Sequence, residues 1–239
     1  MQELIQEILY DYSYSKLFSL SFGYFIVLYF GLAPLFLYCC KWLASKKILY
    51  KIEPKKVTIA QIRFEIRHSL LSIMIFGLSV IPIIYLIRVD IISLLPNTVF
   101  NIILGIFILT LWNEIHFYLV HRLMHYKFFM KRVHYIHHRS KIPTVYSVYS
   151  FHWLEAVLLS TVPLTITPFI PFSIMAIFIY PLVSILLNYA GHCNYRFGHG
   201  EGKSWMLFGT WHNQHHSKAR KNYGFALNLM DKLFQKLKF

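Results

Sequence analysis

Four stretches of this 239-residue chain contain no Asp, Glu, Lys or Arg over lengths close to or above the ~20 residues that cross the hydrocarbon core of a bilayer. They cover residues 17–40, 69–87, 97–113 and 156–195. The third is short, but apolar residues continue beyond Asn113 and Glu114, which predicts a helix running from the membrane into a polar domain. Because 56% of the residues are hydrophobic and the mean hydropathy is +0.48, a bilayer is the expected solvent.

The last stretch is too long for a single span. At ~1.5 Å per residue, a helix over 156–195 would be roughly twice as long as the bilayer core is thick. Proline removes a backbone donor and interrupts a helix, so the prolines in this stretch predict a hairpin of two helices, 154–167 and 172–191. These prolines are Pro163, Pro168 and Pro171. The expected fold is an all-α, multi-pass membrane protein with about three spanning helices plus this helical hairpin.

The distribution of positive charge predicts the orientation. The net charge is +14, and the segments 41–67, 121–152 and 192–239 hold 22 of the 24 Lys and Arg residues. Alternating spans put all three segments on one side, which the positive-inside rule assigns to the cytoplasm. The acidic N-terminal residues 1–15 and the link 88–96 then lie outside. Nucleic-acid binding is excluded, since it requires a basic face on a soluble fold.

The rest of the chain shows no sign of a second domain. No repeat, linker or low-complexity tract interrupts it, which predicts one domain over residues 1–239. The basic segment 41–68 has apolar residues at helical spacing near its end, which favours a helix lying on the membrane surface. An acidic N-terminus before a long apolar run indicates an anchor and not a cleaved signal peptide. Three cysteines without ligand spacing, Cys39, Cys40 and Cys193, indicate a reducing compartment.

Eight of the thirteen histidines fall into three tight clusters. These are His121-Arg-Leu-Met-His125, His134-Tyr-Ile-His137-His138 and His212-Asn-Gln-His215-His216. Histidines three or four residues apart share one helix face, whereas adjacent ones diverge by about 100°. Each H-x-x-H-H cluster can therefore serve two neighbouring metal ions. Eight ligands exceed what one ion with ordinary coordination uses, which predicts a dinuclear centre.

Isolated histidines on apolar helices are more often hydrogen-bonded structural residues, and this is the expectation for His68, His116 and His199. Clustered imidazoles beside membrane spans are different, because without a bound ion they would repel when charged or leave polar groups unpaired when neutral. The spacing does not name the metal, since iron, zinc, copper and nickel all accept imidazole.

The order of these clusters closely resembles the fatty acid hydroxylase/sterol desaturase superfamily of membrane-bound non-haem di-iron enzymes. The resemblance covers roughly residues 105–235 and starts at Trp112-Asn-Glu-Ile-His-Phe-Tyr-Leu-Val-His121. The segment Phe151-His152-Trp-Leu-Glu155 is similar to the family's F-H-P-L-E element. The stretch from Asn222-Tyr223-Gly224 to Asp231-Lys-Leu-Phe234 is similar to its N-Y-G…W-D-R-L-F close.

The resemblance implies a set of iron ligands in a cytoplasmic, histidine-rich helical domain. It comprises His121, His125, His134, His137, His138, His152, His192, His212, His215 and His216, all but His152 also expected to be required for catalysis. Ligating imidazoles usually donate their second N–H to a carboxylate or carbonyl. We therefore expect supporting roles for Glu114, Glu155 and Asp231.

The implied activity is O2-dependent hydroxylation or desaturation of a sterol-like or long-chain membrane lipid. It implies two iron ions per chain, with electrons from an external reductase chain through a cytochrome b5-like or ferredoxin-like protein. Two alternatives remain open: a membrane metal-binding or transport protein, and a catalytically degenerate family member. A transporter would place acids and histidines along the spans, whereas here the clusters lie at span ends.

Overall fold

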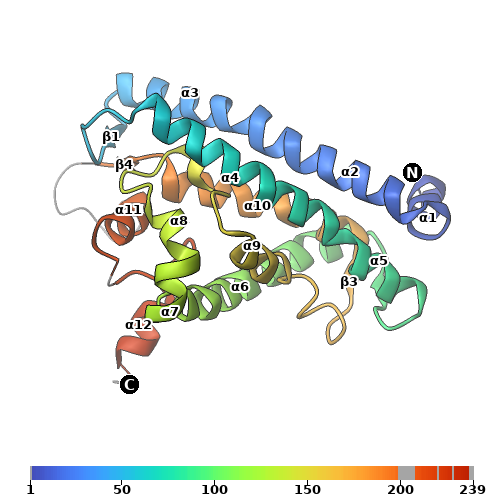
Figure 1. The fold of residues 1–239 in the computed structure, drawn as a ribbon. Coiled ribbons are helices and arrows are strands. Elements are labelled where there is room, and N and C mark those ends of the chain that lie inside the picture. Colours follow the sequence, from blue (N-terminus) through green and yellow to red (C-terminus); the bar gives the residue numbers. More distant parts are fainter. Residues whose placement is uncertain (1, 199–207, 220, 228, 237–239) are drawn as a thin grey trace.

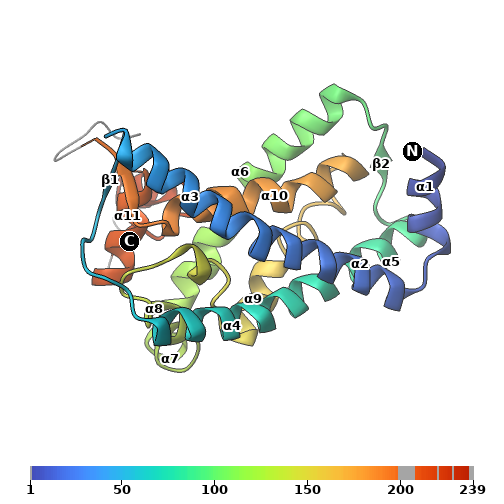
Figure 2. The ribbon, with the colours of Figure 1, turned by 90° about the horizontal axis from the view of Figure 1, so that it is seen from above.

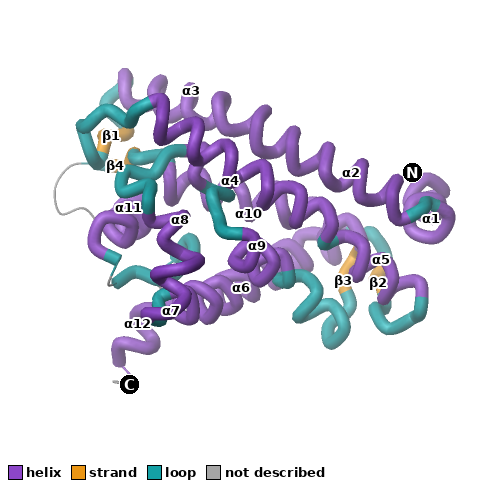
Figure 3. Tube along the Cα trace, viewed as in Figure 1, coloured by secondary structure: helices purple, strands orange, loops and turns teal. Residues whose placement is uncertain are grey.

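The computed structural model describes residues 2–198, 208–219, 221–227 and 229–236. Helices dominate this part of the chain, and the strands are only two or three residues long (Figures 1 and 3). The α-helices are α1 (Gln2–Gln6), α2 (Tyr14–Ile26), α3 (Leu32–Ser45), α4 (Ile59–Leu78), α5 (Val80–Arg88), α6 (Val99–Met124), α7 (Lys127–Phe129), α8 (Tyr135–His138), α9 (Trp153–Ser160), α10 (Ile174–His192), α11 (Phe208–Lys218) and α12 (Leu229–Lys236). Shorter π and 3-10 turns are η1 (Glu7–Asp11), η2 (Val27–Gly31), η3 (Met130–His134) and η4 (Val145–Ser147). The strands are β1 (Leu49–Lys51), β2 (Leu94–Leu95), β3 (Phe172–Ser173) and β4 (Tyr195–Phe197).

Four helical rods are long and apolar enough to cross a membrane. They are Tyr14–Ser45, Ile59–Arg88, Val99–Met124 and Ile174–His192. The first three contain the predicted spans, and the fourth is the second arm of the predicted hairpin. As expected, α6 continues past Asn113 and Glu114 into the polar end of the molecule. The all-α membrane fold predicted from the sequence is confirmed.

Local sequence signals determine where these rods begin and end. Each starts at a Ser or Thr whose hydroxyl accepts a hydrogen bond from the backbone N–H three residues later, at 3.2–3.3 Å. These residues are Ser13, Thr58, Thr98 and Ser173. Residues with positive φ follow three of the rods, namely Lys47, Asp90 and Asn194, and this left-handed conformation stops helix propagation.

The hairpin differs from the prediction in its first arm. A helix was expected over 154–167, but α9 ends at Ser160 and the chain continues through irregular turns to β3. Pro163 has no N–H to donate back to the preceding turn, so the helix cannot be extended through it. At ~1.5 Å per residue, the eight residues of α9 cover only about 12 Å. This arm is therefore too short to span a bilayer.

The segment 41–68 also differs from the prediction. No separate surface helix forms there: α3 runs to Ser45, β1 follows, and the helical spacing near Ile59 belongs to the first turns of α4. The helical spacing of apolar residues near Ile59 is present in the structure. The predicted surface helix is wrong, because the Thr58 cap starts a helix that continues into the apolar run.

The described parts of the three basic segments lie at the same end of the bundle. Antiparallel pairing of β1 with β4 joins the chain after α3 to the chain after α10, with Leu49 opposite Phe197. In Figure 1 this strand pair, α8 and α11 are at the left, whereas α1, α5 and the β2–β3 pair are at the right. Seen from above, α6 and α10 lie side by side, and α2 lies against α4 (Figure 2). The end that holds the basic segments therefore also holds the histidine clusters.

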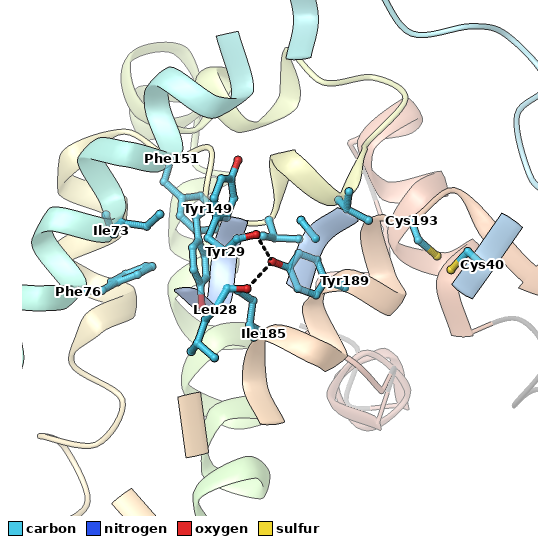
Figure 4. Close-up of a cluster of buried hydrophobic side chains, with 14 of the residues drawn as sticks. Leu28, Tyr29, Cys40, Ile73, Phe76, Tyr149, Phe151, Ile185, Tyr189 and Cys193 are labelled. Carbon is cyan, nitrogen blue, oxygen red and sulfur yellow. Dashed lines mark hydrogen bonds between the residues drawn. The ribbon is translucent and has the colours of Figure 1, made fainter. Parts of the chain in front are cut away.

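Buried tyrosines join the first rod to α10. The Tyr189 hydroxyl donates to the carbonyls of Leu28 and Tyr29 at 3.0 Å (Figure 4). The Tyr29 hydroxyl donates to the Tyr146 carbonyl at 2.7 Å. Both rings are fully buried, and burial of a hydroxyl without a hydrogen-bond partner would cost free energy. These bonds avoid that cost. Cys40 and Cys193 are free thiols at the edge of this cluster.

Candidate metal centre

Nine of the predicted ligands come together from four parts of the chain. His121 lies in the last turn of α6, and His125 is the C-cap of this helix. The second cluster lies in η3 and α8, His192 ends α10, and the third cluster lies in α11. All of these side chains are buried except His125, which is half-buried. Because the contributing helices meet at the polar end of the bundle, distant sequence segments share one site.

The nine imidazoles form two groups, and within each group the potential ligand atoms lie within 4.8 Å of one another. The first group contains His121, His125, His134, His138 and His215. The second contains His137, His192, His212 and His216. Each H-x-x-H-H cluster is thus divided between the groups, as the divergence of adjacent helical residues predicts. This arrangement suits two neighbouring ions.

The distances between ring nitrogens fit coordination to a shared ion. In the first group, His215 Nε2 lies 3.0 Å from His125 Nε2 and 3.1 Å from His138 Nε2. In the second, His212 Nε2 lies 3.0 Å from His192 Nε2 and 3.2 Å from His216 Nε2. With metal–imidazole bonds of about 2.1 Å, such pairs subtend about 90–100° at the ion. They match neighbouring corners of one coordination sphere.

Hydrogen bonds to the outer ring nitrogens orient four of the imidazoles. The Nδ1–H groups of His121, His192 and His215 donate to backbone carbonyls at 2.8, 2.9 and 2.6 Å. Carbonyls can only accept, so each Nδ1 carries the hydrogen and each Nε2 presents a lone pair inward. The fourth is His134, whose Nδ1 lies 2.8 Å from Glu155.

Two of the inner nitrogens lack a hydrogen-bond partner among the described residues. His121 Nε2 and His134 Nε2 are buried without a hydrogen bond in the part of the chain that the structure describes. Leaving acceptors buried and unpaired costs free energy, so a ligand that accepts their lone pairs is expected. A bound metal ion meets this requirement, and imidazole is a ligand that iron, zinc, copper and nickel all accept.

The electrostatic environment keeps the rings in their metal-binding form. Burial lowers the pKa of His125 to about 3, with a smaller effect from His138, and burial lowers the pKa of His138 to about 4. Burial and neighbouring histidines also hold the pKa values of His134, His212 and His215 well below the usual range. At neutral pH these imidazoles are uncharged, as metal ligation requires.

Three acidic residues support the site in different ways. Glu155, in the first turn of α9, accepts directly from His134. Asp231 accepts from the backbone N–H groups of Tyr223 and Gly224 at 3.0 and 2.8 Å, and the Tyr223 carbonyl in turn accepts from His121. Glu114 accepts from two further N–H groups of the same loop, at 226 and 227. Glu155 therefore orients an imidazole directly, while Glu114 and Asp231 hold the loop that orients another.

Other predicted residues lie apart from the two groups. His152 is the N-cap of α9, where its Nδ1 accepts from the Leu154 N–H at 3.2 Å, so the geometry leaves it out of the proposed ligand set. His68 and His116 bind the Phe64 carbonyl and the Thr161 hydroxyl, as expected for structural histidines. His199 lies outside the described residues.

Sequence analysis missed Glu65, which is fully buried in α4. Its carboxylate accepts from Gln61 Nε2 and Ser140 Oγ, both at 2.7 Å, and from the Thr144 hydroxyl. These bonds hold the loop after α8 against α4 and so help to position His137 and His138. The available signal was an isolated acid between Arg63 and Arg67 in a basic segment.

Close packing of α11 also positions the second group. A Cβ added at Gly209 would lie 2.6 Å from the Tyr195 carbonyl oxygen and 2.9 Å from that of Ala190, so only glycine permits this approach. We expect Gly209→Ala to displace His212 and to lower bound metal and activity by about 10-fold or more, comparable to loss of a supporting contact. Metal content per folded chain checks this.

The matched control is Gly31→Ala. An added Cβ there would meet only Val27 Cγ1, at an ordinary 3.9 Å. If both variants retain full metal content, the close approach of α11 is not needed for the site.

An apolar cavity of about 700 Å³ adjoins the centre. Phe117, Phe151 and Phe225 line its end nearest the histidines. The Phe117 ring centroid lies 5.0 Å from that of His121, and the Phe151 centroid lies 4.9 Å from that of His137. No charged side chain and no histidine of the described ranges lines this cavity. Its size is typical of pockets for small organic ligands, and its walls suit an apolar one.

Comparison with known proteins agrees with this geometry. Residues 106–236 match the family model described as fatty acid hydroxylase. A putative methylsterol monooxygenase from Dictyostelium discoideum is 28% identical over 242 residues, covering 94% of this chain and 85% of that protein. Human lathosterol oxidase is 32% identical over 75 residues, covering 31% of this chain and 25% of that protein.

A third relative matches the histidine-rich half. Fatty acid hydroxylase domain-containing protein 2 of Macaca fascicularis is 29% identical over 133 residues, which cover 55% of this chain and 38% of that protein. The chain therefore spans well under half of that relative. No solved structure matches significantly. The family model covers more than half of the chain and includes all three histidine clusters, and the chain therefore belongs to the fatty acid hydroxylase family.

Proposed function

We propose that this protein is a lipid oxidoreductase that uses two histidine-bound iron ions and O2 to hydroxylate or desaturate a sterol-like or long-chain lipid. The observation that carries the proposal is the pair of imidazole groups with nitrogens 3.0–3.2 Å apart, next to an apolar cavity. The names of the relatives, a methylsterol monooxygenase and a lathosterol oxidase, support oxidation of a sterol-like lipid.

The protein's own residues perform four tasks in this proposal. The inner imidazole nitrogens hold the ions, which when bound would supply O2 activation and cleavage of an unactivated C–H bond. Glu155 and the carbonyls of Tyr223, Asn188 and Lys221 hold the rings in orientation. Phe117 and Phe151 limit the access of water at the cavity end. The apolar walls orient the lipid with one end toward the centre.

Metal transport is the main alternative, and the composition of the cavity lining disfavours it. A transport path needs acidic or histidine side chains along the spans. Within the described residues, the cavity between the spans has none, and the candidate ligands gather at one end.

Two measurements test the proposed function. Iron should be present at about two ions per purified chain, and reduction should start O2 consumption in the presence of lipid. Lipid extracts from cells with and without the gene should differ by a product that has gained one oxygen atom or lost two hydrogen atoms. Iron that moves across vesicle membranes without any change in lipid would support transport instead.

We further propose that the metal end faces the cytoplasm, where an electron donor such as a cytochrome b5-like or ferredoxin-like protein supplies electrons. The clustering of the basic segments at this end supports the orientation. The test uses sealed right-side-out vesicles that contain a variant of the protein without the exposed Cys39. In these vesicles, the thiol of Lys218→Cys should not react with a membrane-impermeant reagent. Exposed Ile91, at the opposite end, provides the control, since Ile91→Cys should react. Strong labelling at 218 would reverse the orientation.

A further inference from the structure

The apolar cavity extends along much of the membrane domain. On α10 its lining runs from Ile174 to Asn188, which at ~1.5 Å per residue corresponds to about 21 Å. The Asn188 carbonyl accepts from His192, so this end adjoins the metal centre. Ile174, Ile5 and Ile8 all pack against the same buried cluster around Leu9, so the opposite end of the cavity lies at the N-terminal segment.

The N-terminal segment forms the far wall. Ile5 and Ile8 are half-buried and line the cavity together with Leu4 and Leu9, whereas Tyr10 is exposed and is not among the lining residues. Side chains three residues apart share one face of a helical segment, so Ile5 and Ile8 point inward together. Two branched apolar side chains thus form part of the wall at the far end of the cavity.

Fixed contacts hold this wall in place. Arg88 donates from Nε to the Leu9 carbonyl at 2.6 Å and from Nη2 to the Tyr12 carbonyl at 2.7 Å. Leu9 is buried in a cluster with Ile83, Ile84 and Ile87 of α5. The segment is therefore anchored to α5 at its C-terminal part, and the cavity has a defined length.

We infer that Ile5 and Ile8 are specificity-determining residues that limit the length of the lipid that fits between the far wall and the metal centre. This inference rests on the proposed function, because a limit on length selects substrates only if the reacting carbon of the lipid lies at the metal end. A molecule that reaches the far wall can extend no further. Each methylene group that is left outside the cavity loses about 0.8 kcal/mol of burial, which corresponds to about fourfold in affinity.

Binding of a homologous series of unbranched fatty alcohols to the purified full-length protein tests the inference. Affinity should rise with chain length up to a limit and then stop rising. Ile8→Trp should move this limit to shorter alcohols, and Ile8→Ala should move it to longer ones. At the wild-type limit, each methylene displaced by tryptophan should weaken binding about fourfold.

Tyr10→Trp is the matched control, because it adds the same bulky ring on the exposed side of the same segment and should leave the limit unchanged. Should Ile8→Trp fail to fold, the shift of Ile8→Ala toward longer alcohols decides the matter. An unchanged limit in a folded Ile8→Ala variant would overturn the inference. Because binding is measured without turnover, a shifted limit in a protein that lacks iron or oxidation would refute the proposed function alone.

Discussion

His215→Ala is expected to remove about one iron ion per chain and to lower lipid oxidation at least about 100-fold. His215 Nε2 lies next to Nε2 of both His125 and His138, so the substitution removes the central ligand candidate of the first group. Supporting contacts around metal sites are commonly worth 10–100-fold, and a direct ligand should be worth more. Iron analysis and O2 consumption on the purified variant measure both effects.

His152→Ala serves as the control for this prediction. His152 belongs to the histidine-rich region but caps α9 outside both groups, so its variant should keep two iron ions. His212→Ala should instead empty the second group. Full iron content and activity in His215→Ala would show that the ligand set is wrong, and iron loss in His152→Ala would show that it is incomplete.

Glu155→Gln is expected to weaken iron binding or activity by about 10–100-fold without unfolding the protein. Glutamine keeps the size of the side chain, but it replaces the carboxyl group that accepts from His134 with an amide, which is a weaker acceptor. Glu155→Ala should have a larger effect, because it leaves the His134 Nδ1–H buried and unpaired. Competition with an iron chelator measures the change in affinity.

Glu7→Gln is the matched substitution for comparison, since Glu7 is exposed and far from the centre in the fold. It should bind iron as the unmodified protein does. Equal chelator resistance in Glu155→Gln and Glu7→Gln would mean that the carboxylate near His134 does not support the metal.

Much of the fold follows from short-range signals. The apolar runs, the Ser and Thr caps before Tyr14, Ile59, Val99 and Ile174, and the break at Pro163 all act within one or two helical turns. For the same reason, the division of each H-x-x-H-H cluster between two groups could be predicted. Helix geometry alone sets the directions of neighbouring side chains.

One prediction, the surface helix, was wrong because the same pattern fits two structures. The helical spacing near Ile59 is the same for a surface helix and for the first turns of a span, and only the continuous α4 distinguishes them. His152 lies in a segment that resembles the family's motif. Its imidazole nevertheless caps α9, because the backbone turn at that point directs it toward the Leu154 N–H.

The sequence by itself determined the membrane helices, their caps and the spacing of the histidines, because these properties depend on residues close together in the chain. Only the tertiary structure decided which imidazoles lie close together, which carbonyls accept hydrogen bonds from them, and that the N-terminal segment lines one end of the cavity. Those features need close approach between segments far apart in sequence, such as α11 against α10 at Gly209. Such packing depends on the shapes of both surfaces, which no local pattern specifies.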